Sequence, residues 1–365
     1  MKKIICAVGT RPEAIKMAPV ILALKQSEHI NCKVLATAQH RDMLDQVFDI
    51  FNIVPDFDLD IMRPNQTLTT LTARLLLNLD SIFHSEKPDA VLAQGDTTTV
   101  MTIAMACFYH GIPFGHVEAG LRTGDLSNPF PEEMNRVVAG KLAKWHFAPT
   151  ERARKNLLNE GVDENDIQVT GNTVIDALHS VVDSSPEIGI PLDSSKRLIL
   201  VTAHRRENFG EPIKEICRAI LHLVEHNADI QVLFPVHPNP NVHQIAHELL
   251  GHHSQIILCD PLGYLPFVAA MKAAHIILSD SGGVQEEAPA LGKPVLVMRH
   301  RTERPEAVEA GVVKLVGPVF ENIISETQRL LDNPYAYKQL ARNISPYGDG
   351  KASQRIVETI TKWKI

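Results

Sequence analysis

Short apolar runs alternate with helical segments along almost the whole chain, and this alternation restricts the fold more than any other feature of the sequence. The runs at 3–8 (KIICAV), 90–94 (AVLAQ), 197–203 (RLILVTA) and 275–280 (HIILSD) have the length of buried strands. Each run is followed by a segment with the apolar spacing of a helix. A chain that repeats strand and helix in this way is expected to fold into parallel, doubly wound α/β sheets.

The strand–helix pattern occurs in two successive series, which predicts two domains. Further strands are expected at 33–38, 112–117, 145–149, 231–236, 255–260 and 294–298. The chain of 365 residues exceeds the usual size of one core, and the segment 184–196 has the Pro, Ser and Gly content of a linker. We expect two Rossmann-like domains that face each other across a cleft, at 1–170 and 171–352, with a final helix at 353–365 that packs back on the first.

Composition argues against several classes of protein. The formal net charge of −7, without a basic cluster, argues against a nucleic-acid partner, and no apolar stretch approaches the length that crosses a membrane. The five cysteines have no pairing pattern and predict reduced thiols in the cytoplasm. Although the chain has 17 histidines, it lacks HExxH and paired CxxC spacings, so we expect no metal site.

Three carboxylates mark the stretch from Gln94 to Arg136 as a candidate catalytic region. Asp96 and Glu118 each follow a short apolar run, so both are expected at the carboxyl ends of parallel strands, where open α/β sheets bind ligands. Glu132 follows in a Pro-flanked loop. In the structural alternative, Asp96 caps the helix that follows it and Glu118 pairs with Arg122. The grouping of acids at adjacent strand ends favours a role in proton transfer.

The second half offers a phosphate-binding turn. Ser281-Gly282-Gly283 follows a predicted strand and opens a helix, so free N–H groups and the helix dipole face the strand-end crevice. Glu287 is placed to accept hydrogen bonds from ribose hydroxyls, and Arg304 to contact phosphate or the acids. His204 ends another strand beside two arginines, as in an anion pocket. The alternatives are an ordinary Ser-Gly turn and a histidine that is hydrogen-bonded for structural reasons.

The start of the chain carries a weaker phosphate signal. A turn at Gly9 leads into a helix with Arg11 and Lys16 near its start, but it matches neither GxGxxG nor a Walker loop. Lys16 also fits an ordinary solvated helix position. Acids in one half and phosphate binding in the other predict a nucleotide-linked substrate, either for glycosyl transfer or for rearrangement of a sugar nucleotide. A non-enzymatic nucleotide-sugar sensor is the rival, and the acids weigh against it because carboxylates do not help to bind an anion.

Several segments, in order along the chain, resemble the bacterial-type non-hydrolysing UDP-N-acetylglucosamine 2-epimerases: GTRPEAIKMAP, TAQHRDMLDQ, QGDTTT, GHVEAGLRTGD, PEEMNR, TAHRRENFGEP, SDSGGVQEEAPALGKPVLV, TERPEA and PYGDG. The resemblance runs nearly end to end. It implies a fold like that of GT-B glycosyltransferases, a homodimer and no cofactor. The implied activity is the reversible conversion of UDP-GlcNAc to UDP-ManNAc, which supplies ManNAc-type sugars for surface polysaccharide. Hydrolysing relatives, which release ManNAc and UDP, are the alternative that the spacing of the acids leaves open.

The resemblance also implies roles for single residues. It implies catalysis by Asp96, Glu118, Glu132 and His204, and binding of UDP by Arg11, Lys16, Phe267, Ser281, Gly282, Gly283, Glu287 and Arg304. Members of this family are often activated by UDP-GlcNAc at a second site, which we expect at Gln39, His40, Gln66, Arg206 and His237. Asn65 departs from the arginine of some related enzymes, so the strength of this activation is left open.

Elementary chemistry restricts the mechanism of such a reaction. The C2 proton of this sugar is not next to a carbonyl, and the chain lacks the dinucleotide fingerprint that oxidation at a neighbouring carbon would need. The remaining route expels UDP with loss of the C2 proton to give a 2-acetamidoglucal, and then adds UDP again with protonation on the other face. We expect Asp96, Glu118 and Glu132 to share proton transfer and cation stabilisation, while His204 and Arg11 steady the diphosphate.

Overall fold

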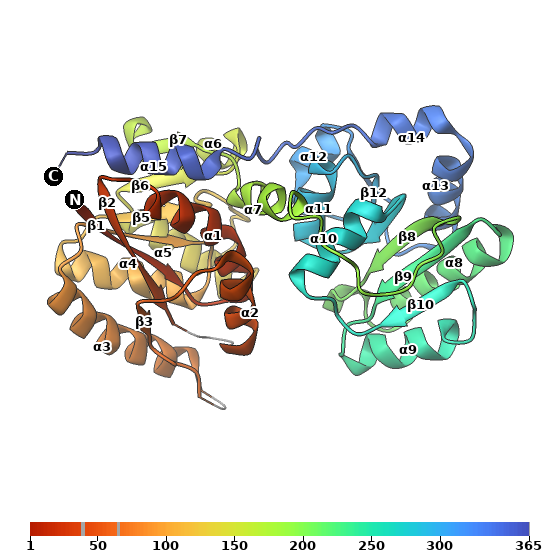
Figure 1. Ribbon diagram of the computed structural model, residues 1–365, viewed down its shortest axis with the longest axis horizontal. Coiled ribbons are helices and arrows are strands. Elements are labelled where there is room, and N and C mark those ends of the chain that lie inside the picture. The colour runs from red at the N-terminus through yellow and green to blue at the C-terminus, as the bar shows by residue number, and fades with distance from the viewer. Residues whose placement is uncertain (38–40, 64–65, 365) are drawn as a thin grey trace. The chain divides into compact units, whose positions relative to one another are not determined.

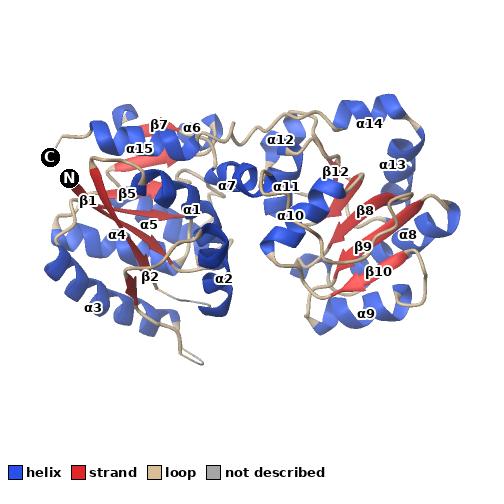
Figure 2. Ribbon diagram, viewed as in Figure 1, coloured by secondary structure: helices blue, strands red, loops and turns tan. Residues whose placement is uncertain are grey.

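The computed structural model describes residues 1–37, 41–63 and 66–364. Its chain divides into two compact units, of which one contains Met1–Ala177 and Tyr347–Ile365 and the other Leu178–Pro346. Each unit has its own parallel sheet with helices on both faces (Figures 1 and 2). The α/β class of parallel sheets that the sequence predicts is confirmed.

The first unit is built on a seven-stranded sheet with the order β3-β2-β1-β4-β5-β6-β7, in which every neighbouring pair is parallel. Its strands are β1 (Lys2–Val8), β2 (Ile30–Ala36), β3 (Phe57–Asp58), β4 (Ala90–Gln94), β5 (Phe114–Val117), β6 (Trp145–Ala148) and β7 (Ile167–Val169). Its helices are α1 (Arg11–Lys25), α2 (Arg41–Phe51), α3 (Leu68–Glu86), α4 (Thr98–His110), α5 (Glu132–Leu142), α6 (Glu151–Asn159), the 3-10 turn η1 (Glu164–Asp166), α7 (Thr173–Val182), which runs across the boundary, and α15 (Ala352–Lys362).

Local capping explains why the chain turns into a helix directly after β1 and β4. Before α1, the Thr10 hydroxyl accepts the N–H of Glu13, and the Glu13 carboxylate accepts the N–H of Thr10. Before α4, the Thr97 hydroxyl accepts the N–H of Val100, and Gly111 ends that helix with φ of 65°. The residues between strand and helix are therefore held at the carboxyl edge of the sheet.

The second unit is built on a six-stranded parallel sheet with the order β10-β9-β8-β11-β12-β13. Its strands are β8 (Arg197–Thr202), β9 (Ile230–Pro235), β10 (Ile256–Cys259), β11 (Ile276–Ser279), β12 (Val295–Val297) and β13 (Val313–Leu315). Its helices are the 3-10 turn η2 (Arg206–Asn208), α8 (Glu211–His226), α9 (Pro240–Leu250), α10 (Tyr264–Ala273), α11 (Gly282–Ala290), α12 (Pro305–Glu309), α13 (Phe320–Asp332) and α14 (Pro334–Leu340).

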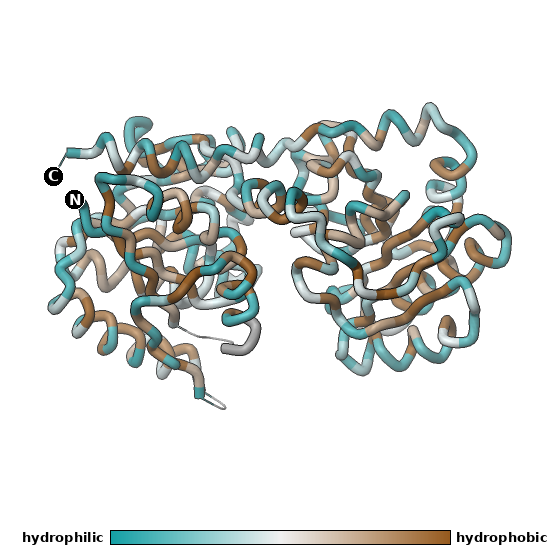
Figure 3. Tube along the Cα trace, in the orientation of Figure 1, coloured by the Kyte–Doolittle hydropathy of each residue, from teal (hydrophilic) through white to brown (hydrophobic). Residues whose placement is uncertain are grey.

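Apolar spacing on the helices matches the faces that they bury. On α8 the fully or nearly fully buried residues include Ile213, Ile216, Ile220 and Leu223, which recur every three or four positions. They join Ile199, Val201 and Phe234 of the sheet in one apolar core. In Figure 3 the strands of this unit are largely brown, which marks hydrophobic residues, whereas its helices alternate between brown and teal. None of the helices within the described ranges is long and apolar enough to span a membrane.

Both sheets reverse their strand order at one place, between β1 and β4 in the first and between β8 and β11 in the second. In open α/β sheets, the loops that leave the carboxyl ends of the two strands at such a switch point diverge and leave a crevice for a ligand. Residues 9–13 and 95–97 therefore flank one switch point, and residues 203–208 and 280–283 flank the other.

The sequence predicts the longer strands to within a few residues, but it misses elements near the ends of both series. The structure adds the strands β7 and β13 and the helices α6, α12, α13 and α14, which the predicted series do not contain. The two strands have three residues each, lie at the edge of their sheets and are only partly buried, so they lack a distinct apolar run. The first unit also extends past 170, because the Asp176 carboxylate accepts the N–H groups of Ala352 and Ser353 in α15.

Candidate active site

Asp96 lies at the switch point of the first sheet, directly after β4, and a cation fixes its orientation. Arg136 of α5 donates to Asp96 Oδ2 through Nε at 2.9 Å and through Nη2 at 2.6 Å. The Asp96 backbone carbonyl accepts the side-chain amide of Asn135 at 2.9 Å. The carboxylate is 30% exposed, so its second oxygen can still meet a ligand. The expected alternative, a cap on α4, is wrong because Thr97 caps that helix.

Glu118 follows β5, the strand next to β4, and its backbone has the left-handed φ of 67°. This conformation costs a non-glycine residue roughly 1 kcal/mol, so the surroundings must hold it in place. Its Oε2 accepts hydrogen bonds from Lys16 Nζ at 2.5 Å, from the Gln94 amide at 2.8 Å and from the Asn172 amide at 3.3 Å. The expected alternative pairing of Glu118 with Arg122 is wrong, since Arg122 forms a two-bond ion pair with Glu160.

Two adjacent acids begin α5, and the structure fixes the second of them, Glu133, by several hydrogen bonds. Glu133 is buried and binds the N–H groups of Thr123 and Gly124 and the guanidinium of Arg136. Burial alone raises the pKa of Glu133, but these donors outweigh it and hold the pKa below its usual value. Within the described ranges, Glu132 has no hydrogen bond or ion pair. It therefore remains a predicted catalytic acid, but no contact joins it to Asp96 or Glu118.

A neutral histidine supports the turn that carries Asp96. His116 lies in β5 and its Nε2 donates to the carbonyl of Gly95 at 2.7 Å. Burial lowers the pKa of His116 to about 4, so the ring is neutral at physiological pH. Gly95 has φ of 93°, a conformation that favours glycine, and the hydrogen bond stabilises this turn.

The switch point of the second sheet contains a buried carboxylate that orients His204. Asp280 follows β11 and is fully buried, and its oxygens accept the N–H groups of His204 and Arg205 and the side-chain amide of Asn208. The Nδ1 atom of His204 lies 3.1 Å from Asp280 Oδ1. Burial raises the pKa of Asp280, but the hydrogen bond and charge of His204 and the backbone donors lower it more, so it stays below its usual value. Nε2 of His204 is therefore the nitrogen left for a ligand.

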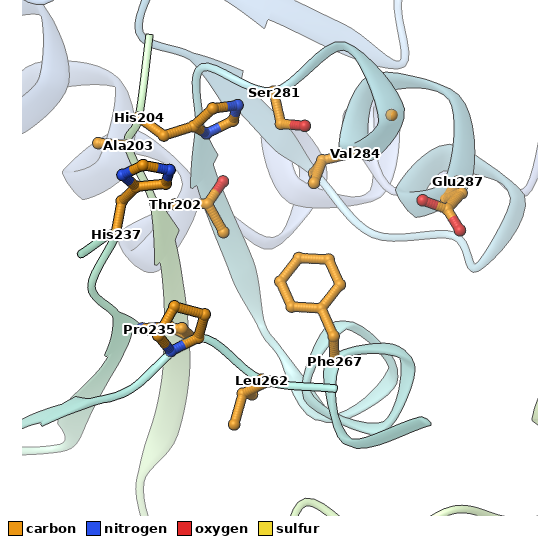
Figure 4. Close-up of a pocket in the computed structure, with 12 residues that line it drawn as sticks. Thr202, Ala203, His204, Pro235, His237, Leu262, Phe267, Ser281, Val284 and Glu287 are labelled. Carbon is orange, nitrogen blue, oxygen red and sulfur yellow. The ribbon is translucent and has the colours of Figure 1, made fainter. Parts of the chain in front are cut away.

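A cavity of about 210 Å³ opens beside His204 in the second unit. It is lined by Thr202, Ala203, His204, Pro235, His237, Pro261, Leu262, Phe267, Ser281, Gly283, Val284 and Glu287. Figure 4 shows the rings of His204 and His237 next to each other, and their centroids are 6.1 Å apart. The Phe267 ring and Leu262 lie across the cavity from them (Figure 4). Apolar walls with a few polar groups suit a planar ring with polar substituents.

The first turn of α11 borders this cavity and supplies donors for an anion. Ser281 precedes the helix and its hydroxyl makes no capping bond, while Gly282 and Gly283 open the helix. A Cβ atom on Gly283 would lie 3.6 Å from the Glu287 carboxylate, whereas one on Gly282 would point to Glu303 at 3.2 Å. Gly283 thus keeps the cavity open at the N-terminal end of α11, where the N–H groups and the helix dipole favour a phosphate.

Of the remaining predicted site residues, one lines the cavity and the others that the structure describes do not. Arg304 donates through Nε to the buried Glu286 and does not line the cavity, and Arg206 is exposed. His237, predicted for activation, lines the same cavity as the residues predicted to bind UDP. In the first unit, the side-chain carbonyl of Gln66 accepts a hydrogen bond from Arg74 Nη1. Gln39, His40 and Asn65 lie outside the described residues.

Sequence reasoning missed the residues that orient the predicted ones. Glu132 and Glu133 lie four and three positions before Arg136, so helical spacing favours an ion pair for either acid, and the structure forms the one with Glu133. The sequence predicts Asp280 only as part of the Ser-Gly turn, and His116 only as the end of a strand. In the part of the chain that the structure describes, no three His, Cys, Asp or Glu side chains are grouped as a metal site requires.

The family model described as UDP-N-acetylglucosamine 2-epimerase matches residues 22–361 of this chain. The UDP-N-acetylglucosamine 2-epimerase of Yersinia pestis is 52% identical over 373 aligned positions, which cover 100% of this chain and 99% of that protein. The enzyme of the same name from Escherichia coli K12 is also 52% identical, with the same coverage. A crystal structure of UDP-GlcNAc 2-epimerase from Neisseria meningitidis bound to UDP-GlcNAc matches with a TM-score of 0.90 and 49% identity, over 99% of this chain and 100% of that one. This chain therefore belongs to the UDP-N-acetylglucosamine 2-epimerase family.

Proposed function

We propose that this protein interconverts UDP-GlcNAc and UDP-ManNAc without hydrolysis. The observation that carries the proposal is the division of chemistry between the two switch points. One has carboxylates held by cations, and the other has a cavity bordered by free helix N–H groups and an oriented histidine. The crystal structure of the Neisseria meningitidis relative contains UDP-GlcNAc, which supports this class of ligand.

In the proposed mechanism, UDP leaves as the C2 proton is removed, which gives a 2-acetamidoglucal, and UDP then adds again after protonation on the other face. The free oxygen of Asp96, the carboxyl group of Glu118 and that of Glu132 share the proton transfers and stabilise the positive charge at the anomeric carbon. Lys16 keeps Glu118 in its position. Which acid serves as the base in each direction is not assigned.

The second unit holds the nucleotide in this proposal. The uracil ring enters the apolar cavity beside Phe267, Glu287 accepts hydrogen bonds from the ribose, and the diphosphate meets Ser281 and the first N–H groups of α11. His204 donates to the departing diphosphate from Nε2, because Asp280 engages Nδ1. Arg11 and Arg304 are predicted to add positive charge to the same group.

Product analysis tests this function directly. Purified protein incubated with UDP-GlcNAc is separated by anion exchange, and the UDP-sugar fraction and free UDP are quantified over time. We expect a new UDP-sugar peak of UDP-ManNAc at constant total UDP-sugar. Accumulation of free ManNAc and UDP would assign the hydrolysing reaction instead. Unchanged UDP-GlcNAc that binds to the protein would favour a glycosyltransferase without its acceptor or a sensor.

Activation by a second molecule of UDP-GlcNAc is the regulatory part of the proposal. Arg206 is exposed beside the oriented His204 and can contact a second ligand, and His237 lies at the border of the cavity. The expected result is a sigmoidal dependence of the rate on UDP-GlcNAc that becomes hyperbolic in Arg206→Ala. Arg218→Ala, which also removes an exposed arginine of this unit, should keep the sigmoidal curve. A hyperbolic curve for the unmodified protein would contradict activation.

A homodimer is the assembly in this proposal. Leu77 of α3 and Phe108 and Tyr109 of α4 are 75%, 65% and 68% exposed, and the two helices pack against each other. Exposed large apolar side chains on neighbouring helices are typical of an interface. Light scattering after size exclusion should give twice the 40.4 kDa of the chain, and Phe108→Asp should reduce it. A monomer at every concentration would contradict the dimer.

The cytoplasm is the proposed compartment. All five cysteines are free thiols, and four of them are buried in the cores. The Cys32 thiol donates to Cys6 Sγ at 3.9 Å and forms no disulfide with it, which fits a reducing environment.

A further inference from the structure

Glu118 is held by a donor that the mechanism above does not use. Its Oε2 atom accepts the side-chain amide of Asn172 at 3.3 Å, in addition to Lys16 and Gln94. Lys16 belongs to α1 and Gln94 ends β4, whereas Asn172 lies just before α7, 54 positions along the chain from Glu118. Because only 3% of Asn172 is exposed, water cannot readily replace this donor.

Other hydrogen bonds fix which end of this amide meets Glu118. The Oδ1 atom of Asn172 accepts the N–H group of Val174 at 3.1 Å. The oxygen therefore faces the start of α7, and the NH₂ group is the end left for Glu118. The backbone N–H group of Asn172 donates to the carbonyl of Tyr347 at 2.5 Å, and Tyr347 is itself buried. Asn172 is thus held through both its side chain and its backbone.

Asn172 lies where the two segments that connect the units touch each other. The chain leaves the first unit after Ala177 and returns to it at Tyr347. A Cβ atom on Gly171 would lie 3.0 Å from Gly348 Cα, and one on Gly348 would lie 3.2 Å from Gly171 Cα. Glycine at both positions therefore lets the two backbones meet. The side chain that binds Glu118 is positioned by both connecting segments.

We propose that Asn172 is a positioning residue for Glu118, and that it ties this acid to the two segments that connect the units. The inference rests on the proposed function, because it gives Glu118 a proton-transfer step. A neutral amide donor stabilises the ionised carboxylate without cancelling its charge, so Glu118 stays available as a base. Lys16 supplies charge through a flexible side chain, whereas Asn172 supplies a direction that its own hydrogen bonds fix.

The pH dependence of turnover tests this role with two variants. Asn172→Ser keeps an oxygen for the Val174 N–H group but is too short to reach Glu118. Asn172→Asp keeps the shape of the side chain and places a second carboxylate beside Glu118. Because the amide favours the ionised acid, the acidic limb of the curve should move to higher pH in both variants. We expect a shift of about one pH unit in Asn172→Asp and a smaller one in Asn172→Ser.

Asn333→Ser is the matched control. Asn333 caps α14 in the second unit through Oδ1, so this variant also replaces a capping amide by a hydroxyl and should leave the acidic limb unchanged. Lys16 and His116 also face Glu118, but both are present in every variant. A turnover that falls by the same factor at every pH in both variants of Asn172 would overturn the proposal and leave Asn172 with a purely structural role.

Two glycines test the part that the connecting segments play. Gly171→Ala would bring a Cβ atom to 3.0 Å from Gly348 Cα and so displace the backbone next to Asn172. Its acidic limb should move in the same direction as that of Asn172→Ser. Gly189→Ala is the control, because Gly189 has a φ of 73°, against 89° for Gly171, and has nothing within 4 Å of its Cβ position. An acidic limb in Gly171→Ala that matches the unmodified protein would contradict the link to these segments.

A measurement without substrate separates this inference from the proposed function. The two tryptophans of the chain, Trp145 and Trp363, belong to the first unit, so their fluorescence follows the unfolding of that unit in urea. Asn172→Ser and Glu118→Ala should each lower the urea midpoint, and together they should lower it by less than the sum of the two losses. If this coupling is found while UDP-GlcNAc is not converted, the proposed function fails and Asn172 still holds Glu118. If the losses add up in an active protein, the inference about Asn172 fails alone.

Discussion

Each of the two sheets has a candidate site at its switch point, but the carboxylates at the two switch points have different partners. At the end of β4 and β5, carboxylates point to cations, with Asp96 on Arg136 and Glu118 on Lys16. At the end of β11, the carboxylate of Asp280 is buried and turns to the backbone and to His204. In the proposed mechanism, the carboxylates of the first site take part in proton transfer, whereas the carboxylate of the second orients His204 toward an anionic ligand.

The comparison teaches that strand order fixes where a ligand can bind, while the first residues after each strand decide what happens there. Both switch points lead into a helix, yet α1 begins with a buried acid and α11 begins with two glycines. A side chain at Gly9, after β1, would collide with the groups around Glu13. A side chain at Gly283 would enter the cavity. Substitutions at the first switch point should therefore change turnover, and substitutions at the second should change the affinity for UDP.

The largest effect is expected from Asp96→Asn. Turnover should fall by about a thousandfold, because an amide cannot exchange the proton that the mechanism requires. Affinity for UDP, measured by calorimetry, should stay unchanged, since the second site supplies the binding. Asp80→Asn, at an exposed acid of the same unit, is the control and should keep full activity. A variant of Asp96 that keeps its turnover would remove this residue from the mechanism.

The next effect concerns stability, and its direction follows from the pKa of Glu13. In the unfolded chain the pKa of this group is near its ordinary value of 4.5, whereas burial in the folded protein raises the pKa to about 7. The stability that it contributes is full below pH 4.5 and is lost as the pH rises through 7. Relative to Glu13→Gln, the unmodified protein should lose roughly 3 kcal/mol between these values. Calorimetric melting curves of both proteins across this range check the difference, and parallel curves would contradict it.

Asp280→Asn tests the second switch point, because Asp280 orients His204 and is therefore expected to affect the binding of UDP. Without the carboxylate, His204 loses the partner of Nδ1, and affinity for UDP should fall by about tenfold or more. Asp260→Asn changes an exposed acid directly after another strand of the same sheet and should leave affinity unchanged. Equal UDP affinity in both variants would show that the orientation of His204 does not matter for binding.

The smallest effect distinguishes two adjacent glycines. In Gly283→Ala the added methyl group enters the cavity at ordinary contact distance from Glu287, so the fold is kept while UDP affinity falls by about threefold. In Gly282→Ala the methyl group would lie 3.2 Å from the Glu303 carboxylate, away from the cavity lining, and the backbone donor remains, so UDP affinity should fall less. Fluorescence titration with UDP compares the two, and the opposite order would place the diphosphate elsewhere.

The fold could be predicted from the sequence wherever burial on both faces gives a strand a continuous apolar run. β4 and β11 are such strands, and the predicted positions of Asp96 and Ser281 follow from them. β7 and β13 could not be found in this way, since their partly buried edges leave a mixed pattern. The positions of the acids after β4 and β5 could be predicted because a short apolar run shows where each strand ends.

The partners of these acids could not be predicted, because they come from distant parts of the chain. Glu118 is held by Lys16, which is 102 positions away, and Asp96 by Arg136, which is 40 positions away. Burial decides which of the neighbours Glu132 and Glu133 is fixed, and the local sequence does not encode burial for adjacent identical residues. Burial likewise raises the pKa of Glu13 to about 7, which the local sequence does not indicate.

The most direct test of the account is proton NMR of the purified protein with UDP-GlcNAc in D₂O, without added NAD or metal. The account predicts UDP-ManNAc with deuterium at C2, because the C2 proton is lost to a carboxyl group that exchanges with solvent before the proton returns. UDP-ManNAc that keeps the original hydrogen at C2 would contradict the proton-transfer role of the first site, even though the protein would still be an epimerase.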